Sequence, residues 1–325
     1  MNDPVSEELR GVVAGPVLLP GDAGFADEVA VYNLNNYLEP AVAVGVTSVA
    51  DVRAVVRLAA ARRLPVAVRT TGHQVAQHAG GAILINTSRM DGVRIDADAR
   101  TARVEAGVRW SAVTAAAAEY GLAPMSGSTL SVGVVAYLLG GGQSPVFGRS
   151  QGYAADHVRE IELVTADGEL RQVTAADEPD LFWALRGGKG NFGVVTAIEF
   201  DLFPVSEFYG GGLHFPGERM ASVLRVWRTW ALTLPEEATT SVAVQRLPPI
   251  PELPEPLRGA FVLHVRFAFL GSTEDGARLL APIRAVTAAI LDDVRTRPYT
   301  ESALIHASPS TGTSASAPCC AATCG

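Results

Sequence analysis

The segment from Thr47 to His73 constrains the fold more than any other part of this 325-residue chain. Apolar residues recur at helical spacing from Thr47 to Leu64 after a Thr-Ser cap, and Pro65 follows them. The next four residues, 66–69, have the β-branched character of a strand, which leads into a turn of small residues before His73. A helix, a strand and such a turn commonly present backbone N–H groups to a phosphate. His73 is therefore either an ordinary turn residue or a group placed for chemistry.

The rest of the chain alternates short strands and helices as far as Pro204 and then changes to longer elements. The stretch 158–174 alternates apolar and polar residues around Asp167-Gly168, which is a hairpin signal. We expect strands at 82–86, 93–96, 101–107 and 194–203, helices at 110–121 and 177–187, and after Pro204 a helix near 216–232, strands near 239–246 and 260–270 and a helix near 273–287. The change in element length predicts a domain boundary at about 205.

One strand of the later part has two distinguishable faces. His264 and Arg266 fall on one face of the segment 261–269 among smaller residues. The other face carries the large apolar residues Phe261, Leu263, Val265, Phe267 and Phe269. This pattern is typical of an antiparallel sheet with one packed face and one polar face. The polar face is either solvated or lines a cleft.

Composition and charge exclude several classes of partner. The net charge of −8 is spread along the chain without a basic stripe, so nucleic acid is not expected as a partner. The acidic N-terminus lacks the pattern of a secretory signal, and the longest apolar windows, such as 132–139, are too short to cross a bilayer. We therefore expect no membrane partner and a cytoplasmic location.

The last residues of the chain differ from the rest. Cys319, Cys320 and Cys324 are the only cysteines, so any redox chemistry of the folded body must come from a bound cofactor. After Ile305 no large apolar residue occurs, and such a composition predicts disorder from about residue 307. The segment is either a natural tail or out-of-frame sequence in place of a missing end.

Two glycine clusters have different meanings. Gly188 to Gly193 matches G-x-G-x-x-G, but a helix precedes it and a strand follows it, which is the reverse of the order in a Rossmann dinucleotide site. Lys189 is followed by Gly, so a phosphate-binding P-loop is excluded as well. The second cluster, from 127 to 158, is either a turn-rich core segment or a place where a large flat ligand approaches the backbone.

Three motifs in order along the chain resemble one family. They are RTTGH at 69–73, VGVVAYLLGGG at 132–142 with FGRSQGYAADHV after it, and DLFWALRGGKGNFGVVTAIEFDLFPV at 180–205. Together they resemble the FAD-linked oxidases of the berberine bridge enzyme type, which are similar in fold to the vanillyl-alcohol oxidase superfamily. The resemblance covers about residues 25 to 305.

The resemblance implies an α+β fold. A PCMH-type FAD-binding domain of two subdomains is followed by a partial substrate domain with an antiparallel sheet and helices. The implied ranges are an N-terminal segment at 1–35, the FAD-binding domain at 36–205, the partial substrate-binding domain at 206–306 and a disordered tail at 307–325.

The resemblance also implies FAD as cofactor and locates its contacts. In the family, the loop that matches Arg69 to Gln74 wraps the FAD diphosphate with backbone amides, and the histidine that matches His73 is bonded to the flavin 8α-methyl. The stretch that matches Asn191 to Val195 approaches the adenine or the ring edge. Ordinary turn or strand geometry is the alternative, with a capping or core role for His73. The implied cofactor-binding residues are Arg69, Thr70, Thr71, Gly72, His73, Gln74, Gly127, Ser128, Thr129, Gly133, Val134, Asn191, Gly193, Val194 and Val195.

Several positions depart from the family pattern. Thr71 stands where the family usually has the first glycine of R-S-G-G-H, so a β-branched residue is placed where the backbone may need a positive φ. Thr129 stands where doubly linked members have a cysteine, which leaves one covalent bond, and Gln143 stands where sugar-oxidising members often have tyrosine. His78 matches no family role. His264 and Arg266 are the candidates for lining a pocket.

The implied reaction is oxidation of a small organic substrate, an alcohol, an amine or a related C–H compound. Hydride passes to flavin N5, a base removes a proton, and molecular oxygen takes the electrons. The family's substrate domain continues past this length and often contains the base, so the chain resembles a C-terminally truncated member and no base is assigned. The alternatives are a truncated FAD-binding protein without turnover and a general nucleotide-binding module.

Overall fold

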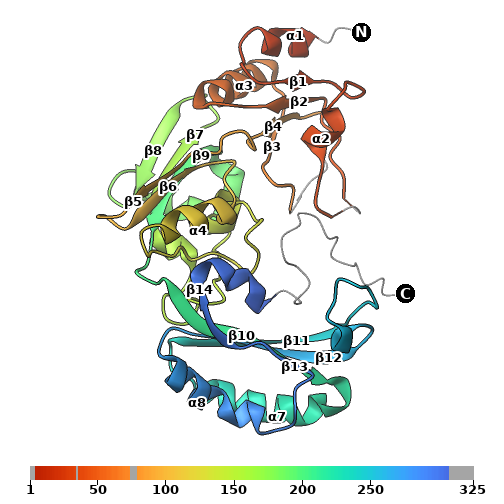
Figure 1. Cartoon of the computed structure of the whole chain (residues 1–325). Coiled ribbons are helices and arrows are strands. Elements are labelled where there is room, and N and C mark those ends of the chain that lie inside the picture. Colours follow the sequence, from red (N-terminus) through yellow and green to blue (C-terminus); the bar gives the residue numbers. More distant parts are fainter. Residues whose placement is uncertain (1–3, 34–35, 74–78, 307–325) are drawn as a thin grey trace. The chain divides into compact units, whose positions relative to one another are not determined.

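The computed structural model describes residues 4–33, 36–73 and 79–306, and they form an α+β structure, as expected (Figure 1). The chain divides into two compact units, which we describe separately. The first consists of Met1–Ala116, Ser131–Gly142 and Ala155–Leu202, and the second of Ala117–Leu130, Gln143–Ala154 and Phe203–Gly325. The longest segment of the second unit thus begins near the boundary predicted at 205, but two earlier loops also belong to this unit. The four ranges given above stay a prediction.

The first unit begins with a four-stranded sheet. Its strand order is β1-β2-β4-β3, in which β2, β4 and β3 are parallel and β1 is antiparallel to β2. Apolar residues of α3, among them Val52 and Val55, pack with Ile83 and Ile85 of β4. The elements are α1 (Pro4–Arg10), β1 (Val17–Leu18), α2 (Phe25–Val29), β2 (Val42–Gly45), α3 (Val49–Arg62), β3 (Val66–Arg69) and β4 (Ile83–Asn86).

The start and end of α3 follow from local sequence, which confirms the predicted helix and the strand after it. The Ser48 hydroxyl accepts a hydrogen bond from the Asp51 backbone N–H at 3.2 Å. The Asp51 carboxylate in turn accepts from the backbone N–H groups of Ala14 and Thr47, each at 2.8 Å. Arg63 ends the helix in a left-handed conformation, with φ +54°.

The first unit also contains a five-stranded antiparallel sheet of order β5-β6-β9-β7-β8. The hairpin predicted at Asp167-Gly168 joins β7 to β8, and Gly168 has φ +77°. Trp110 is fully buried and packs against Phe200, with ring centroids 5.5 Å apart. The elements are β5 (Val93–Asp96), β6 (Thr101–Glu105), α4 (Trp110–Ala118), α5 (Val134–Leu138), β7 (Val158–Val164), β8 (Leu170–Thr174), α6 (Pro179–Gly188) and β9 (Val194–Asp201).

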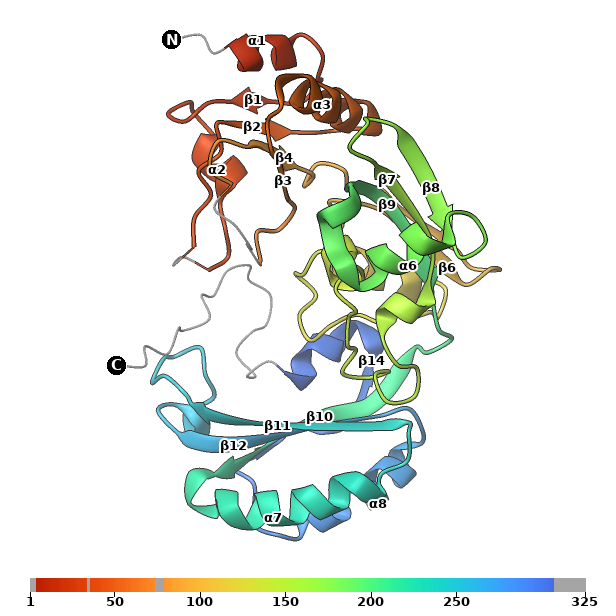
Figure 2. The same ribbon diagram turned by 180° about the vertical axis from the view of Figure 1, so that it is seen from behind.

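The second unit is built on a sheet of order β11-β12-β10-β13, with β14 also paired to β10, and all pairs are antiparallel. Helices α7 and α8 cover one face of this sheet (Figure 2). The elements are β10 (Glu207–Pro216), α7 (Met220–Trp230), β11 (Ala238–Arg246), β12 (Phe261–Phe269), α8 (Thr273–Arg284), β13 (Leu291–Asp292) and β14 (Arg295–Pro298).

Turns of 3-10 helix occur in both units, at Ala154–His157, Lys189–Phe192, Gly217–Arg219, Ala231–Thr233, Glu255–Leu257 and Tyr299–Ile305. In the described part of the chain no helix has the length and apolar character that a membrane span requires.

Strand β12 follows its predicted faces with two differences. Leu263, Val265 and Phe267 are buried with α7 and α8, as expected. Phe261 is 43% exposed instead, and the guanidinium of Arg246 lies 5.3 Å from its ring centroid. His264 is not on a solvated face, since it is only 1% exposed.

The buried imidazole of His264 stacks on a second buried histidine. His214 lies directly opposite His264 in the β10·β12 register, and the two ring centroids are 4.0 Å apart at an angle of 15°. Among the described residues, none of the four ring nitrogens has a hydrogen-bond partner. Gly212 makes room for the pair, because a Cβ at that position would lie 2.1 Å from Nε2 of His264. The sheet therefore encloses two imidazoles without compensating bonds.

Burial controls the charge of these rings. Burial, together with the nearby His214, Arg266 and His306, lowers the pKa of His264 to about 2. Burial also lowers the pKa of His214 to about 4, although Asp293 opposes this shift. Both rings are thus neutral in the folded protein at neutral pH.

The histidine pair predicts acid sensitivity. In the unfolded chain these side chains take up protons below their ordinary pKa of 6.5, whereas in the folded chain they stay neutral down to about pH 4 for His214. The free energy of unfolding should therefore fall as the pH drops from about 7 to 5.5, approaching about 1.4 kcal/mol per pH unit for each ring. Urea unfolding followed by tryptophan fluorescence at several pH values measures this slope.

The double variant H214L/H264L serves as the comparison. It should unfold at similar or higher urea concentration at pH 7, because two unpartnered buried polar groups are removed. Its stability should change less between pH 7 and 5.5 than that of the original chain. An equal pH slope in both proteins would contradict the assignment.

Candidate functional site

The turn after β3 is held closely against the segment 30–32 of the first unit. Gly72 has φ +66°, and its carbonyl accepts a hydrogen bond from the Tyr32 backbone N–H at 2.8 Å. A Cβ at Gly72 would lie 2.6 Å from the Ala30 oxygen and 2.9 Å from Cα of Val31. Both the backbone angle and the close approach require glycine here.

Thr70 and Thr71 precede this glycine, and the structure shows whether Thr71 has the positive φ that the sequence comparison suggested. Thr70 Oγ1 lies 2.6 Å from Thr87 Oγ1, which anchors the turn to the chain after β4. Thr71 is not among the described residues with a positive φ, so the concern that it occupies a left-handed position was wrong. Its methyl group would instead lie 3.3 Å from a Cβ placed on Gly133. The departure at Thr71 therefore leaves the turn unstrained.

The segment with Gly133 and Val134 lies beside this turn because of a short antiparallel pairing. Arg109 and Gly133 form an isolated bridge, in which the Trp110 N–H donates to the Val132 oxygen at 3.1 Å. The Val134 N–H donates to the Val108 oxygen at 2.9 Å. Val134 as a whole is fully buried. The structure thus brings two of the predicted loops together.

His73 lies at the exposed end of the turn. Its ring packs against the ring of Tyr32, with centroids 5.1 Å apart at an angle of 45°. The exposure of the imidazole disagrees with the alternative of a core histidine. Gln74 and His78 lie outside the described residues.

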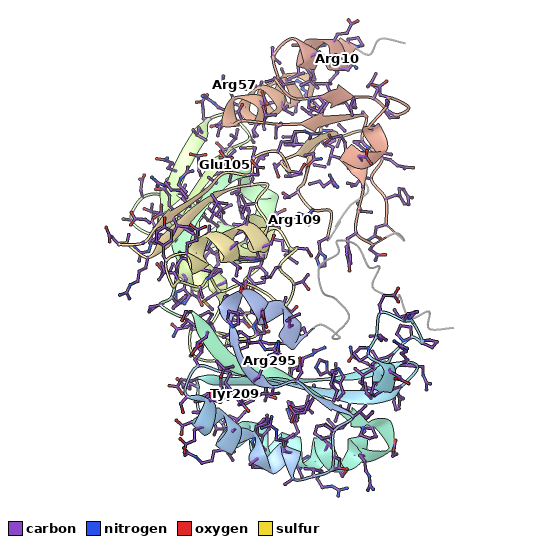
Figure 3. The ribbon with its side chains drawn as sticks, in the orientation of Figure 1. Arg10, Arg57, Glu105, Arg109, Tyr209 and Arg295 are labelled. Atoms are coloured by element: carbon purple, nitrogen blue, oxygen red, sulfur yellow. The ribbon has the colours of Figure 1, made fainter. Side chains whose placement is uncertain are left out.

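Arginines give this region a positive charge. The Arg69 Nε donates to the Ala30 oxygen at 2.6 Å. The guanidinium of Arg109, which is labelled in Figure 3, donates to the Ser131 oxygen at 2.6 Å. Arg89 is also near, but it pairs with Glu28, a carboxylate that is 4% exposed. Two guanidiniums therefore remain without a paired carboxylate among the described residues.

The charges act on one another, as the pKa of Arg69 shows. Burial lowers this pKa, and Glu28 opposes that shift. Arg109 and Arg89 lower it further through repulsion between like charges. A bound anion would relieve this repulsion. Arg109 was not predicted from the sequence, because only the bridge to Gly133 places it beside the turn.

The loop from Gly187 to Gly193 lies against the other end of α5. The Gly187 N–H donates to the Leu139 oxygen at 2.9 Å, and a Cβ at Gly140 would lie 3.1 Å from Cε of Lys189. Asn191 is exposed, and its side-chain amide donates to the Gly188 oxygen at 2.7 Å. Helix α5 therefore has the 69–73 turn at its start and the 187–193 loop at its end.

The remaining residues of that stretch are packed inside the unit. Val194 and Val195 of β9 are 5% and 6% exposed, and Val194 belongs to the core that includes α3. A Cβ at Gly193 would lie 2.6 Å from the Val164 oxygen, so this glycine permits close strand packing. These three residues can approach a ligand through their backbone, while their side-chain positions serve the fold.

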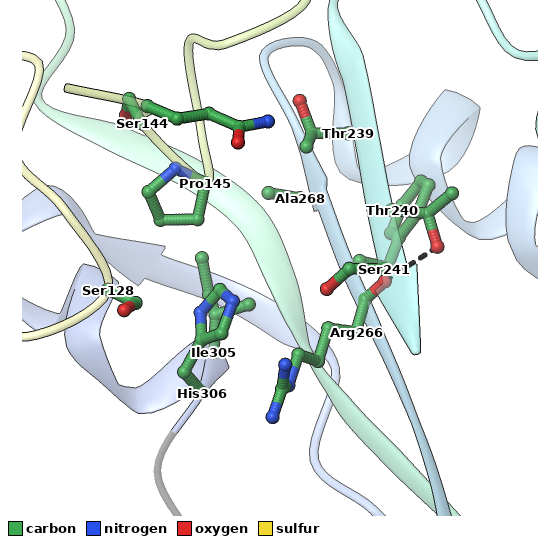
Figure 4. A pocket seen from close by; sticks show the side chains of 12 residues that line it. Ser128, Ser144, Pro145, Thr239, Thr240, Ser241, Arg266, Ala268, Ile305 and His306 are labelled. Atoms are coloured by element: carbon green, nitrogen blue, oxygen red, sulfur yellow. Dashed lines mark hydrogen bonds between the residues drawn. The ribbon is translucent and has the colours of Figure 1, made fainter. Parts of the chain in front are cut away.

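Gly127, Ser128 and Thr129 belong to the second unit. Gly127 is buried, whereas Ser128 and Thr129 are exposed. Ser128 lines a pocket of that unit, and so do Gln143 and Arg266 of the residues discussed from the sequence (Figure 4). His264 is not among the lining residues.

The first-unit residues fit a dinucleotide with a diphosphate. The turn is fixed by its close packing against residues 30–32, and the guanidiniums of Arg69 and Arg109, which have no paired carboxylate among the described residues, complement negative charge. The imidazole at the end of the turn is accessible for a bond to the ligand. Among the described residues no group of three or more His, Cys, Asp or Glu side chains is arranged to hold a metal ion.

Comparison with known proteins gives the same assignment. Residues 40–174 match the family model of the FAD binding domain. The chain is 38% identical over 177 residues to the FAD-dependent monooxygenase FUP4 of Fusarium proliferatum, a match that covers 54% of this chain and 34% of that protein. It is 28% identical over 306 residues to (R)-6-hydroxynicotine oxidase of Paenarthrobacter nicotinovorans, covering 91% of this chain and 63% of the relative.

Solved structures share the fold. The crystal structure of 6-hydroxy-D-nicotine oxidase from Arthrobacter nicotinovorans superposes with a TM-score of 0.82 at 26% identity, covering 96% of this chain and 66% of that one. The chain therefore spans between about one third and two thirds of the length of these relatives. Residues 40–174 are an FAD binding domain, and the chain is similar to FAD-dependent oxidoreductases beyond it.

Proposed function

We propose that the chain acts as an FAD-dependent oxidoreductase on a small organic substrate, with the flavin bonded to His73. The observation that carries this proposal is the turn at Gly72, which is packed too closely for a side chain and ends in an exposed imidazole. The names of the relatives, an FAD-dependent monooxygenase and a 6-hydroxynicotine oxidase, support an oxidative reaction.

Each part of the first unit has a distinct task in this proposal. The backbone of the 69–73 turn and the guanidiniums of Arg69 and Arg109 would hold the diphosphate. Gly133 lies beside Thr71, so the 131–134 segment adjoins the turn. The His73 imidazole would supply the nitrogen that bonds to the flavin 8α-methyl carbon; this carbon would lose a C–H proton, the flavin would keep the two electrons, and oxygen would then remove them. When bound, FAD accepts a hydride from the substrate and passes electrons to oxygen.

A direct test of activity uses the flavin colour. Purified protein is mixed without oxygen with a panel of amines and alcohols that includes 6-hydroxynicotine, and the flavin absorbance is followed. Bleaching by one compound and recovery on admission of air would support the oxidase. The alternative, FAD binding without turnover, predicts retained colour and no bleaching by any member of the panel.

The tether gives a separate prediction. In the original chain the flavin should remain with acid-precipitated protein, whereas in H73A it should stay in the supernatant, because the bonding nitrogen is removed. The variant H157A, which replaces another histidine of the first unit, should retain the flavin like the original chain. Flavin in the supernatant of the original chain would contradict a covalent bond.

The turn at Gly72 predicts which glycine FAD binding requires. A Cβ in G72A meets backbone atoms at 2.6 Å and 2.9 Å, and a positive φ costs about 1–2 kcal/mol for a non-glycine residue. We expect the flavin-to-protein ratio of purified G72A to fall severalfold.

A nearby glycine provides the matched control. Gly80 has no atom within 4 Å of a Cβ placed on it, so G80A should bind FAD like the original chain. The absorbance ratio of flavin to protein measures both variants. Equal flavin content in G72A and G80A would show that the turn does not control cofactor binding.

A further inference from the structure

A polar pocket of about 230 Å³ lies entirely within the second unit. Three parts of that unit form it: the segments around Ser128 and Gln143, the strands β11 and β12, and the chain end of the Tyr299–Ile305 turn (Figure 4). Its lining residues are Ser128, Gln143, Ser144, Pro145, Thr239, Thr240, Ser241, Arg266, Phe267, Ala268, Ile305 and His306. The lining therefore contains one arginine and no carboxylate.

The charge of Arg266 has no counter-charge in the described structure. Its Nε is buried and has no hydrogen-bond partner among the described residues. In the sheet register it lies opposite Gly212 on one side and Ser241 on the other, neither of which is acidic. Burial lowers the pKa of Arg266, and no carboxylate opposes that shift. The side chain is half-buried and has no carboxylate partner among the described residues, which makes this guanidinium a site for an anion.

Other arginines of the same unit show what a paired guanidinium looks like. Arg284 contacts the carboxylate of Asp292 at 2.7 Å, and Arg297 contacts that of Asp293 at 3.3 Å. In each pair a carboxylate compensates the charge of an arginine that lies on or near the same sheet. Arg266 therefore differs from these two arginines of the same unit, each of which has a carboxylate partner.

The neighbouring histidines leave the pocket with a single positive charge. Burial lowers the pKa of His306, which lines the pocket, to about 4, and Arg266 lowers it further. His264 has its pKa lowered by the same two causes. Both rings are neutral at neutral pH. One fixed charge matches a monoanion better than a dianion such as hydrogen phosphate.

The rest of the lining suits a small organic group. Pro145, Ala268 and Ile305 provide apolar contacts, whereas the Ser241 hydroxyl is a polar group next to Arg266 (Figure 4). The Thr240 hydroxyl is already used, because it donates to the Arg266 backbone oxygen at 2.7 Å. The guanidinium presents two parallel N–H groups in the geometry that a carboxylate accepts.

We propose that this pocket binds a small organic monocarboxylate, with its carboxylate on the guanidinium of Arg266 and its apolar part against Pro145 and Ile305. This goes beyond the proposed oxidation and does not depend on it. The planar guanidinium of Arg266 binds the carboxylate, and the small apolar surface limits the size of the rest of the ligand. The expected ligands are therefore aromatic or aliphatic acids of the size of benzoate.

The test is calorimetric titration of the purified full chain with benzoate, benzamide and inorganic phosphate. Benzoate should bind with a Kd of about 1 mM or tighter, which is ordinary for a ligand of this size. Benzamide has the same shape without the charge and should bind at least about tenfold more weakly. Benzoate binding that is no stronger than benzamide or phosphate binding would overturn the proposal.

Variants at Arg266 separate charge from geometry. R266Q should lose at least about tenfold in benzoate affinity, and R266K should lie between R266Q and the original chain, because lysine keeps the charge without the fork. R246Q is the matched control, since Arg246 lies on the same sheet outside the lining, and it should bind benzoate normally. Undiminished benzoate binding by R266Q would overturn the proposal.

Folding and flavin content are measured on the same samples. R266Q removes a half-buried charge without a carboxylate partner, so its thermal midpoint without ligand should equal or exceed that of the original chain. Its flavin content should be unchanged, because Arg266 is not among the predicted FAD contacts. Carboxylate binding and oxidase activity can thus fail independently, and the two results distinguish this proposal from the proposed function.

Discussion

The closeness of two backbone segments at Gly72 is the constraint on which the proposed cofactor site depends. A single missing Cβ lets the turn after β3 lie against residues 30–32 with a hydrogen bond to Tyr32. That contact determines where Thr71 meets Gly133 and where His73 leaves the turn. The parallel sheet beneath holds the turn in place, because β3 ends beside β4 at Asn86. The chemistry at His73 therefore rests on backbone geometry more than on any side-chain network.

The two units differ in whether their buried or half-buried polar and charged side chains have hydrogen-bond partners. In the first unit the buried carboxylate of Glu28 receives hydrogen bonds from Asn86 and Arg89, so its charge is compensated within the fold. In the second unit the guanidinium of Arg266 and the imidazoles of His214 and His264 have no such bonds among the described residues. Folded proteins usually satisfy buried polar groups. Of these three side chains only that of Arg266 lines the pocket, and the proposed anion site is therefore placed there.

Much of the fold was predictable from sequence. The helix α3, the hairpin at Asp167-Gly168 and the long strands of the second unit depend on caps, turn residues and periodicity, which are local signals. The FAD binding domain was identified from ordered motifs, and comparison confirmed it. The prediction for β12 was correct for its packed face, but it missed that His264 is buried against His214.

The missed features all depend on contacts between distant segments. Arg109 joins the site through a bridge to Gly133, and Arg266 becomes a pocket residue through segments near 143 and 305. The assignment of residues 117–130 and 143–154 to the second unit likewise follows from packing. No local sequence pattern predicts such contacts, because the sequence of a strand or loop does not show which distant segment packs against it.

The most direct test of the account is peptide mass spectrometry of the FAD-saturated protein. Trypsin should release residues 70–89 as one peptide, since Arg69 and Arg89 bound it and no Lys or Arg lies between them. The account predicts that this peptide carries the flavin mass and that fragmentation places the mass on His73. A peptide of unmodified mass, or a flavin on His78 instead, would contradict it.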